Sequence, residues 1–307
     1  MNVKTRGLLV AALMVVSLAH SAIAETLGEH PAVTVARTWS TRGIDPNTFM
    51  VLHPAGPQFL AVSPTGMQPA TVQSTKPTIV LVHGAFADSS SWNGVIAELL
   101  AEGYRVVAAA NPLRSVKIDA YHVESLLNAI EGPIVLVGHS YGGTVITNAV
   151  NGNRNVKALV YVAAFAPDED ETTSELSGRY PGGTLGTALA PPVSLPAGGK
   201  DLYIQQEKFG AQFAADVPSS KAKVLAAMQR PISEAALNEP SGTPAWKSTP
   251  SWFIYGDLDK NVPAAALAFM AERAGSKETV VIKGASHVPM VSHPDAVASL
   301  IRRAAAN

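Results

Sequence analysis

The sequence contains no cysteine. Disulfide bonds therefore cannot staple the fold, and the thiolates that many structural zinc sites use are missing. No His-x-x-x-His pair occurs, and no glycine-rich loop leads into Lys followed by Ser or Thr. Zinc sites of the helical type and phosphate sites of the P-loop type therefore have no support in the sequence. We expect neither a metal nor a cofactor.

Blocks of like charge are also missing. The chain has 23 basic and 24 acidic residues and a net charge of −1, and no Lys/Arg cluster stands out. Proteins that bind nucleic acid or anionic surfaces present a basic patch or stripe. We therefore expect no nucleic-acid partner, and a small, fairly apolar molecule as the substrate.

Only one long apolar run is present, near the N-terminus. Lys4 and Arg6 precede the run Leu8–Leu18, and the small residues Ala22 and Ala24 follow it on either side of an isoleucine. This order is typical of a secretory signal peptide that is cleaved before Glu25. An uncleaved anchor helix is the alternative, but the run is short for a membrane span. We predict that residues 1–24 are a signal peptide, that the protein is exported to the periplasm or secreted, and that no stable membrane anchor remains.

The rest of the chain divides into an irregular part and a regular part. Residues 25–75 are rich in Pro, Gly, Ser and Thr, and we predict an N-terminal extension with an early strand over 57–62. From residue 76 onward strand-like runs alternate with helical stretches. The strands are expected near 78–83, 104–110, 133–138, 156–162, 251–256 and 278–283, and the helices near 92–102, 117–130, 142–150, 263–273 and 294–305. This alternation predicts an α/β fold with a mostly parallel central sheet and helices on both faces.

Residues 168–249 interrupt the alternation. They contain a Gly/Pro-rich part, 180–200, and then two helical stretches, 204–214 and 221–228. Because ligands bind at the carboxyl ends of parallel strands, an insertion after the strand at 156–162 emerges at the ligand-binding edge. We predict a helical cap there. A plain surface insertion is the alternative.

The most informative motif follows the strand at 133–138. It reads Gly138-x-Ser140-x-Gly142 and leads into a helical stretch. A strand, a sharp turn and a helix in this order lift a serine hydroxyl above the sheet, and the two glycines leave room for the turn. We predict Ser140 as a nucleophile and the backbone N–H of Tyr141 as an oxyanion donor.

Residues that follow three other strands provide the remaining groups of the predicted site. His83 and Gly84 follow the strand at 78–83, which makes the backbone N–H of Ala85 the second expected oxyanion donor. Asp259 follows the strand at 251–256, and His287 follows the last strand. We predict His287 as the base and Asp259 as the acid that orients it. Two other carboxylates stay open as alternatives for the acid, Asp257 and, more remotely, Asp168.

The order Ser, Asp, His belongs to the α/β-hydrolases. The region from about residue 76 to 306 resembles that superfamily, and most closely its small-capped branch of plant methyl esterases and hydroxynitrile lyases, whose histidine loop is similar to Gly284–Pro294. The lyases of that branch have Thr where this chain has Gly84, and Lys directly after the histidine, where this chain has Val288. Both differences imply ester hydrolysis rather than cyanohydrin cleavage.

The combined prediction is an exported serine hydrolase. It would cleave a small carboxylic ester through an acyl-enzyme on Ser140, without metal or cofactor. Lactone or amide hydrolysis, perhydrolysis and carbon–carbon cleavage by the same triad stay open, as does a non-catalytic binding protein on this scaffold. Four apolar side chains near the motifs are candidates for the substrate pocket or for plain core packing: Phe86, Trp92, Phe165 and Met290.

Overall fold

The computed structural model describes residues 35–36, 48–53, 56–61, 76–150 and 152–307. The chain divides into two units, residues 1–73 and 74–307. The first unit contains an antiparallel sheet of β1 (Val35–Ala36), β2 (Thr48–His53) and β3 (Gly56–Ala61). The predicted early strand corresponds to β3, and the predicted signal peptide lies outside the described residues.

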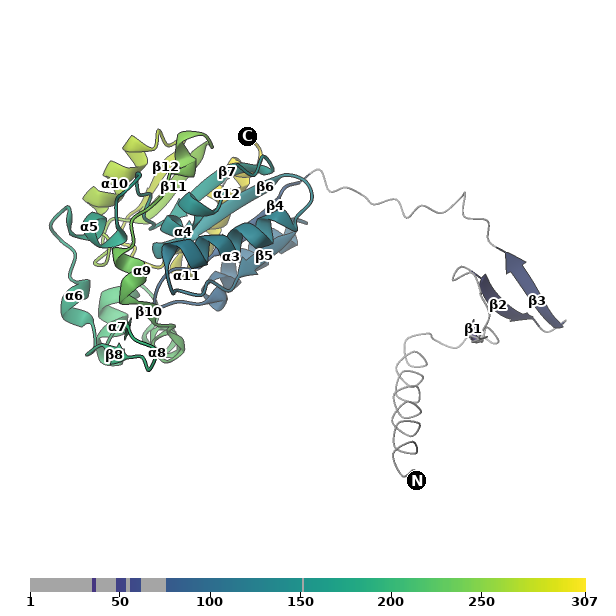
Figure 1. Cartoon of the computed structure of the whole chain (residues 1–307), viewed down its shortest axis with the longest axis horizontal. Helices are drawn as coiled ribbons and strands as arrows, with labels where there is room; N and C mark the ends of the chain where they lie inside the picture. The colour runs from purple at the N-terminus through teal and green to yellow at the C-terminus, as the bar shows by residue number, and fades with distance from the viewer. Residues whose placement is uncertain (1–34, 37–47, 54–55, 62–75, 151) are drawn as a thin grey trace, which may run out of the picture. The chain divides into compact units, whose positions relative to one another are not determined.

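The second unit is built on a six-stranded sheet in which every pairing is parallel (Figure 1). Its strand order is β12-β11-β7-β6-β4-β5. The strands are β4 (Thr78–Val82), β5 (Val106–Ala109), β6 (Ile134–His139), β7 (Val156–Val162), β11 (Ser251–Gly256) and β12 (Thr279–Ile282). All six lie where the apolar runs predict them, and the α/β fold class is confirmed.

The continuous apolar strands reflect burial on both faces of the sheet. Every residue of β4, β6 and β11 is buried, as expected for central strands of a parallel sheet. Helices α2 (Asn93–Ala101) and α12 (Pro294–Ala305) pack together on one face. On the other face α3 (Val116–Asn128) packs on α4 (Tyr141–Ala149), and α10 (Ala264–Arg273) packs against β11.

The segment between β7 and β11 forms the cap. Its helices are α5 (Thr173–Gly178), α6 (Leu185–Ala188), α7 (Gln206–Phe213), α8 (Ser219–Met228), α9 (Glu234–Asn238) and the 3-10 turn η2 (Ala245–Lys247). The two helical stretches of the prediction correspond to α7 and α8. The cap also holds a small antiparallel sheet of β8 (Val193–Ser194), β9 (Lys200–Leu202) and β10 (Ile232–Ser233). The sequence did not indicate this sheet, because strands of two or three residues are too short for a periodic pattern.

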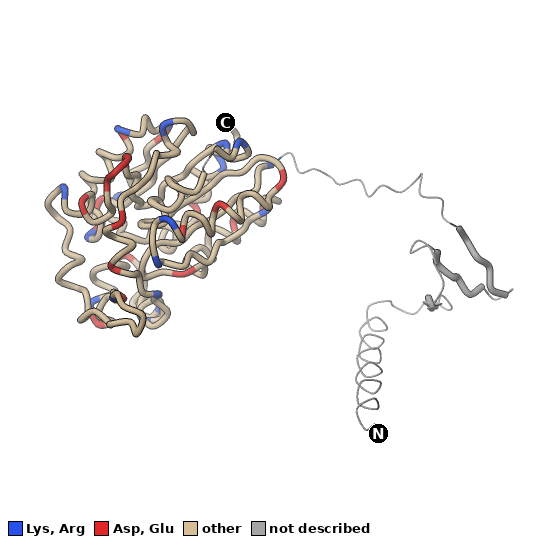
Figure 2. The backbone as a smooth tube through the Cα atoms, in the orientation of Figure 1, with Lys and Arg blue, Asp and Glu red and all other residues tan. Residues whose placement is uncertain are grey.

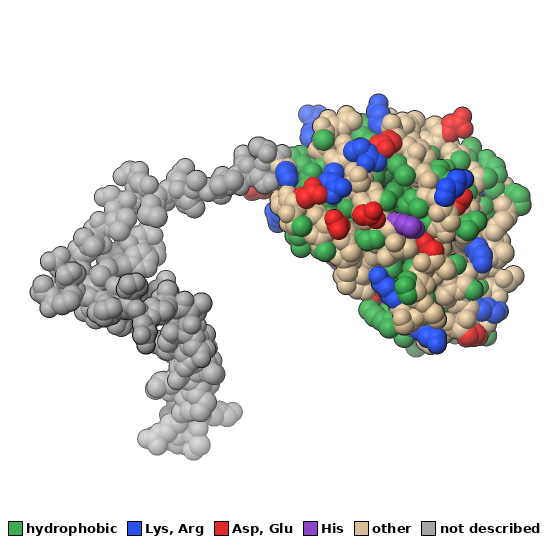
Figure 3. All heavy atoms as spheres, turned by 180° about the vertical axis from the view of Figure 1, so that it is seen from behind, with side chains coloured by type: hydrophobic (Ala, Val, Ile, Leu, Met, Phe, Trp, Pro, Cys, Tyr) green, Lys and Arg blue, Asp and Glu red, His purple; other side chains and the backbone are tan. Residues whose placement is uncertain are grey.

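Basic and acidic residues are interspersed along the backbone of the second unit (Figure 2). On the face shown in Figure 3 both signs alternate with apolar and neutral side chains, and no field of one sign dominates that face. Within the described ranges, no helix has the length and apolar character needed to cross a membrane.

Candidate active site

Ser140 lies in the turn between β6 and α4 with φ of +52° and ψ of −124°. Few non-glycine residues adopt a positive φ, and such strain persists only where the surroundings impose it. Here the end of β7 braces the turn: the Ser140 amide donates to the Val162 carbonyl, and the Phe165 amide donates to the Ser140 carbonyl, both at 3.2 Å. The serine side chain therefore stands on a rigid base.

Two glycines permit this turn because the backbone segments touch. A Cβ at Gly138 would lie 2.5 Å from the Gly142 carbonyl oxygen, and a Cβ at Gly142 would lie 2.5 Å from the Val82 carbonyl oxygen. Both distances are well inside van der Waals contact. Any larger residue at either position would push α4 away from the strands that carry the site.

The three triad candidates are joined by two hydrogen bonds, although 147 residues separate Ser140 from His287. The Ser140 hydroxyl donates to His287 Nε2 at 2.8 Å, and His287 Nδ1 donates to Asp259 Oδ2 at 2.6 Å. The other Asp259 oxygen accepts the Asn261 and Val262 amides at 2.8 and 2.9 Å. The carboxylate is therefore held at both oxygens, and the histidine is aligned between acid and serine.

The two alternative acids lie in other interactions. Asp257 accepts the Gly284 amide at 2.7 Å and pairs with Lys283 at 3.2 Å, so it braces the start of the histidine loop. Asp168 pairs with Lys247 at 2.5 Å. Of the three carboxylates considered from the sequence, only Asp259 reaches His287.

The oxyanion side of the site lies at the end of β4. A Cβ at Gly84 would lie 2.7 Å from Ser140 Cβ and 2.6 Å from the His139 carbonyl oxygen, so the loop that carries the Ala85 amide packs directly on the serine turn. The Tyr141 amide begins α4. Neither amide donates to a protein acceptor within the described residues. Free amides at a helix start and in an adjacent loop suit a developing oxyanion.

His83 orders this loop from within the core. Its Nδ1 donates to the Gly84 carbonyl at 3.0 Å, its Nε2 accepts the Asn111 amide at 3.0 Å, and the Asn111 side-chain amide donates to the His83 carbonyl. Burial lowers the pKa of His83 to about 4. The ring is therefore neutral at pH 7 in a single tautomer, which fixes the backbone before Ala85.

His139 holds the histidine loop against the serine turn. Its Nε2 donates to the His287 carbonyl at 2.9 Å, and the two rings lie 4.9 Å apart. Complete burial, followed by the nearby His287, lowers the His139 pKa well below the usual value, so the ring stays neutral. This link to the His287 backbone becomes visible only in the tertiary structure.

The cap contributes a residue that the sequence analysis did not identify. The Phe213 ring, at the end of α7, stands edge-on to the His287 ring at 5.0 Å and to the Phe86 ring at 6.2 Å. Ser140 and His287 keep only 6% and 1% of their surface exposed. The triad is thus roofed by the cap. No local motif marks Phe213, because its position depends on how the cap folds back.

The predicted pocket residues divide into two groups. Phe86 lines a cavity under the cap, together with Phe213. Trp92, Phe165 and Met290 are at most 5% exposed and belong to the hydrophobic core. Tyr141 also points away from the serine, because its hydroxyl donates to Asp119 at 2.9 Å. For Tyr141, then, only the backbone is placed to serve the reaction.

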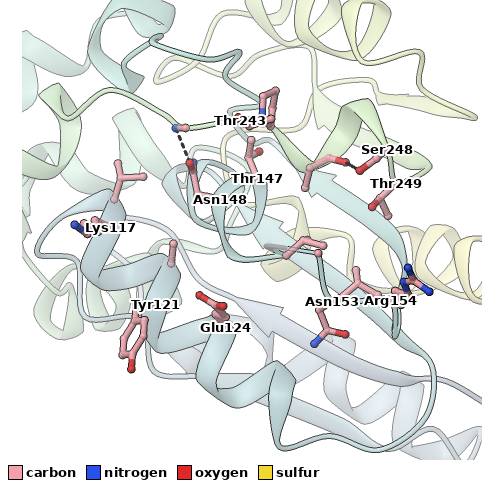
Figure 4. A pocket seen from close by; sticks show the side chains of 18 of the residues that line it. Lys117, Tyr121, Glu124, Thr147, Asn148, Asn153, Arg154, Thr243, Ser248 and Thr249 are labelled. Atoms are coloured by element: carbon pink, nitrogen blue, oxygen red, sulfur yellow. Dashed lines mark hydrogen bonds between the residues drawn. The ribbon is translucent and has the colours of Figure 1, made fainter.

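The largest cavity described, about 1150 Å³, lies elsewhere (Figure 4). It is a groove between α3, the end of α4 and the segment 239–250, at the opposite end of α4 from Ser140. Two polar side chains in its wall already have partners: Asn148 bonds to Ser241 and Gly242, and Thr147 bonds to Gly143. Size alone therefore does not make this groove the reaction site.

Among the residues that the structure describes, no group of three or more His, Asp or Glu side chains is placed to hold a metal ion.

A family model described as the alpha/beta hydrolase family matches residues 79–300. The chain belongs to this family. The alpha/beta hydrolase is 27% identical to a pimeloyl-[acyl-carrier protein] methyl ester esterase of Aeromonas hydrophila, over 73% of this chain and 94% of that protein. It is 28% identical to a pyrethroid hydrolase of Sphingobium wenxiniae, over 73% and 85%.

Solved structures show the same fold. This hydrolase matches polyneuridine aldehyde esterase with a TM-score of 0.65 and 18% identity, over 74% of this chain and 98% of that one. It matches a methylesterase from Arabidopsis with a TM-score of 0.60 and 18% identity, over 75% and 99%. The resemblance to the plant methyl esterase branch is confirmed.

Proposed function

We propose that this alpha/beta hydrolase is a carboxylic ester hydrolase that works through an acyl-enzyme on Ser140. The hydrogen-bonded line from Ser140 through His287 to Asp259 is the observation that carries the proposal. Relatives of this chain named as a methyl ester esterase and as a pyrethroid hydrolase support the same reaction class.

The residues then have distinct roles. His287 takes the proton as Ser140 Oγ attacks the ester carbonyl, and Asp259 stabilises the imidazolium. The Ala85 and Tyr141 amides hold the oxyanion. His287 gives its proton to the leaving alcohol, and then activates the water that releases the acid. Every proton moves between protein, substrate and water.

The tight packing around Gly84 favours ester hydrolysis over lyase chemistry. The related lyases have Thr at this position, and a Cβ here would lie 2.7 Å from Ser140 Cβ. The oxyanion loop would have to move away from the serine to accept it. The loop as it stands suits a tetrahedral intermediate formed on Ser140.

Ser140→Ala tests the proposal. We expect loss of aryl acetate hydrolysis by about 10⁴-fold or more, loss of labelling by a fluorophosphonate probe, and an unchanged melting temperature. Ser299→Ala, on the outer helix α12, is the control and should keep both the hydrolysis of aryl acetate and the labelling by the probe. A Ser140→Ala variant that retains a tenth of the turnover would overturn the assignment of the nucleophile.

We also propose that residues 1–24 direct export and are then removed, on the strength of the basic, apolar and small-residue order at 4–24. The intact mass of the protein recovered from the periplasm and the medium tests this. A protein that begins at Glu25 is expected, and an exclusively intracellular protein that retains Met1 would contradict it.

A further inference from the structure

A small apolar cavity lies next to the triad, under the cap. It is formed by α7, α8 and the residues that follow β4 and His287. Six apolar side chains make up much of its wall: Phe86, Phe209, Phe213, Leu225, Met228 and Val291. We call this space the cap chamber.

The polar groups of the cap chamber are already engaged. Asp88 accepts the Ser90 amide and hydroxyl at 2.8 and 2.5 Å, and Gln229 bonds at both ends of its amide to the Ile204 backbone. No Lys or Arg is among the residues that line the chamber. An anionic group would find no cationic partner there, and an uncharged apolar group would lose no hydrogen bond. The cap chamber is therefore suited to an uncharged apolar group.

Phe213 stands between the cap chamber and the triad. Its ring lines the chamber and also contacts the His287 ring at 5.0 Å. The cavity volume is only about 10 Å³, room for about one water molecule. An ester with its carbonyl at Ser140 and an apolar group in the chamber requires the Phe213 ring to turn aside.

Hydrogen bonds hold the backbone on both sides of Phe213. The neighbouring Gln212 donates to the Asn261 side chain at 2.9 Å and to the Lys260 carbonyl at 3.0 Å. Past the end of α7, Asp216 accepts a hydrogen bond from Ser286. Both anchors join the end of α7 to the loops that carry Asp259 and His287. A change in the Phe213 rotamer alone would leave these anchors in place.

We propose that the cap chamber is the subsite for an uncharged apolar group of the ester, and that Phe213 is the residue that sets how large this group can be. The inference rests on the proposed ester hydrolysis and adds the substrate class: esters whose acyl or alcohol part is an uncharged hydrocarbon group, not half-esters of dicarboxylic acids.

The test is a kcat/KM profile over two ester series. One series varies the acyl chain of p-nitrophenyl esters from acetate to decanoate, and the other varies the alcohol of alkyl acetates. In Phe213→Ala we expect the preference for long over short chains to rise by about tenfold or more in the series whose varied group enters the chamber. Phe213→Leu, which keeps an apolar side chain, should give an intermediate shift and guards against a folding defect in the Ala variant.

A pair of neighbours on α8 provides the matched control. Leu225 lines the chamber, whereas Val224 is 55% exposed on the outer side. Leu225→Ala should shift the chain-length profile in the direction of Phe213→Ala, and Val224→Ala should leave it unchanged. Adipate half-esters should be poor substrates for all variants.

The outcomes separate the two proposals. Absence of acetate hydrolysis by the wild-type protein would overturn the proposed function. Intact acetate hydrolysis with the same profiles for the wild type, Phe213→Ala and Leu225→Ala in both series would overturn the chamber assignment alone.

Discussion

Ser140 keeps a backbone conformation that is costly for a residue with a side chain, and its neighbours explain why it is tolerated. The Val162 carbonyl and the Phe165 amide fix the turn from the adjacent strand. Asp259 is fixed in a similar way by the two amides that follow it. The site thus consists of side chains whose backbone and hydrogen bonds are set before any substrate binds.

The acid offers a sharp comparison within one loop. Asp259→Asn should lower turnover by about 10⁴-fold, because an amide at this position favours the wrong histidine tautomer. Asp257→Asn should change turnover only a few-fold and lower the melting temperature slightly, because Asp257 bonds to Gly284 and Lys283 instead of the base. Turnover of both purified variants on one activated ester decides the matter; an inactive Asp257→Asn beside an active Asp259→Asn would reverse the assignment.

His83 should make the protein less stable in mild acid. Its pKa is about 4 in the folded protein, against 6.5 in an unfolded chain, so the unfolded state binds the proton more readily between these values. The free energy of unfolding should therefore fall as pH drops from 6.5 towards 4, by on the order of 3 kcal/mol from this residue.

Urea unfolding at several pH values measures this effect. In His83→Gln the fall should be shallower, and what is left should include the contribution of His139, whose pKa is also lowered. Equal slopes for both proteins would show that His83 does not carry the effect.

At the scale of elements, the cap is joined to the catalytic loops at a few defined points. The Phe86 amide donates to the Arg230 carbonyl at 3.0 Å, and Asp216 lies between Ser286 and His293. Burial alone would raise the Asp216 pKa, but hydrogen bonds from Ser286 and Ser292 lower it below its usual value. The carboxylate therefore stays charged at neutral pH and keeps its hold on the histidine loop.

Asp216→Asn should loosen this connection. We expect faster hydrogen exchange of the amides of α7, Gln206–Phe213, because the helix loses a charge-assisted bond at its end. The central strand β6 should exchange as slowly as before. Glu272→Gln, an exposed change of the same charge on α10, is the control. Unaltered exchange of α7 in Asp216→Asn would argue against the anchor.

At the scale of the molecule, the parallel sheet brings the site together. The strands β6, β11 and β12 end at one edge, and Ser140, Asp259 and His287 follow these ends. All of them lie in the unit of residues 74–307, as do both oxyanion amides and the cap. This unit contains every group that the proposed reaction uses.

A shortened protein of residues 74–307 should therefore fold and hydrolyse the same ester. We expect its kcat to stay within about twofold of the longer protein, because every described residue of the buried core lies in this unit. Kinetics on one aryl ester and a thermal melt test this. A cooperative melt with no activity would show that residues before 74 serve the site.

From local patterns the sequence predicted the six strands of the parallel sheet, five helices around it and two helices of the cap. It also predicted three residues, Ser140, Asp259 and His287, that hydrogen bonds join in the structure. It could do so because these features are local: continuous apolar runs mark strands of a parallel sheet, and glycines at fixed spacing mark the serine turn. The choice of Asp259 over Asp257 was also made from local chain geometry. In the structure Asp259 is hydrogen-bonded to His287, the predicted base.

The surroundings of the triad depend on long-range packing. Phe213 reaches His287 across a distance in the chain that no pattern encodes, and Trp92 and Met290, which lie near the motifs in sequence, turn into the core. The short strands of the cap and the His139 link to the His287 carbonyl also depend on segments that meet only after folding. Chain periodicity reports which face of an element is buried, whereas the partner that covers it is set by how the elements pack.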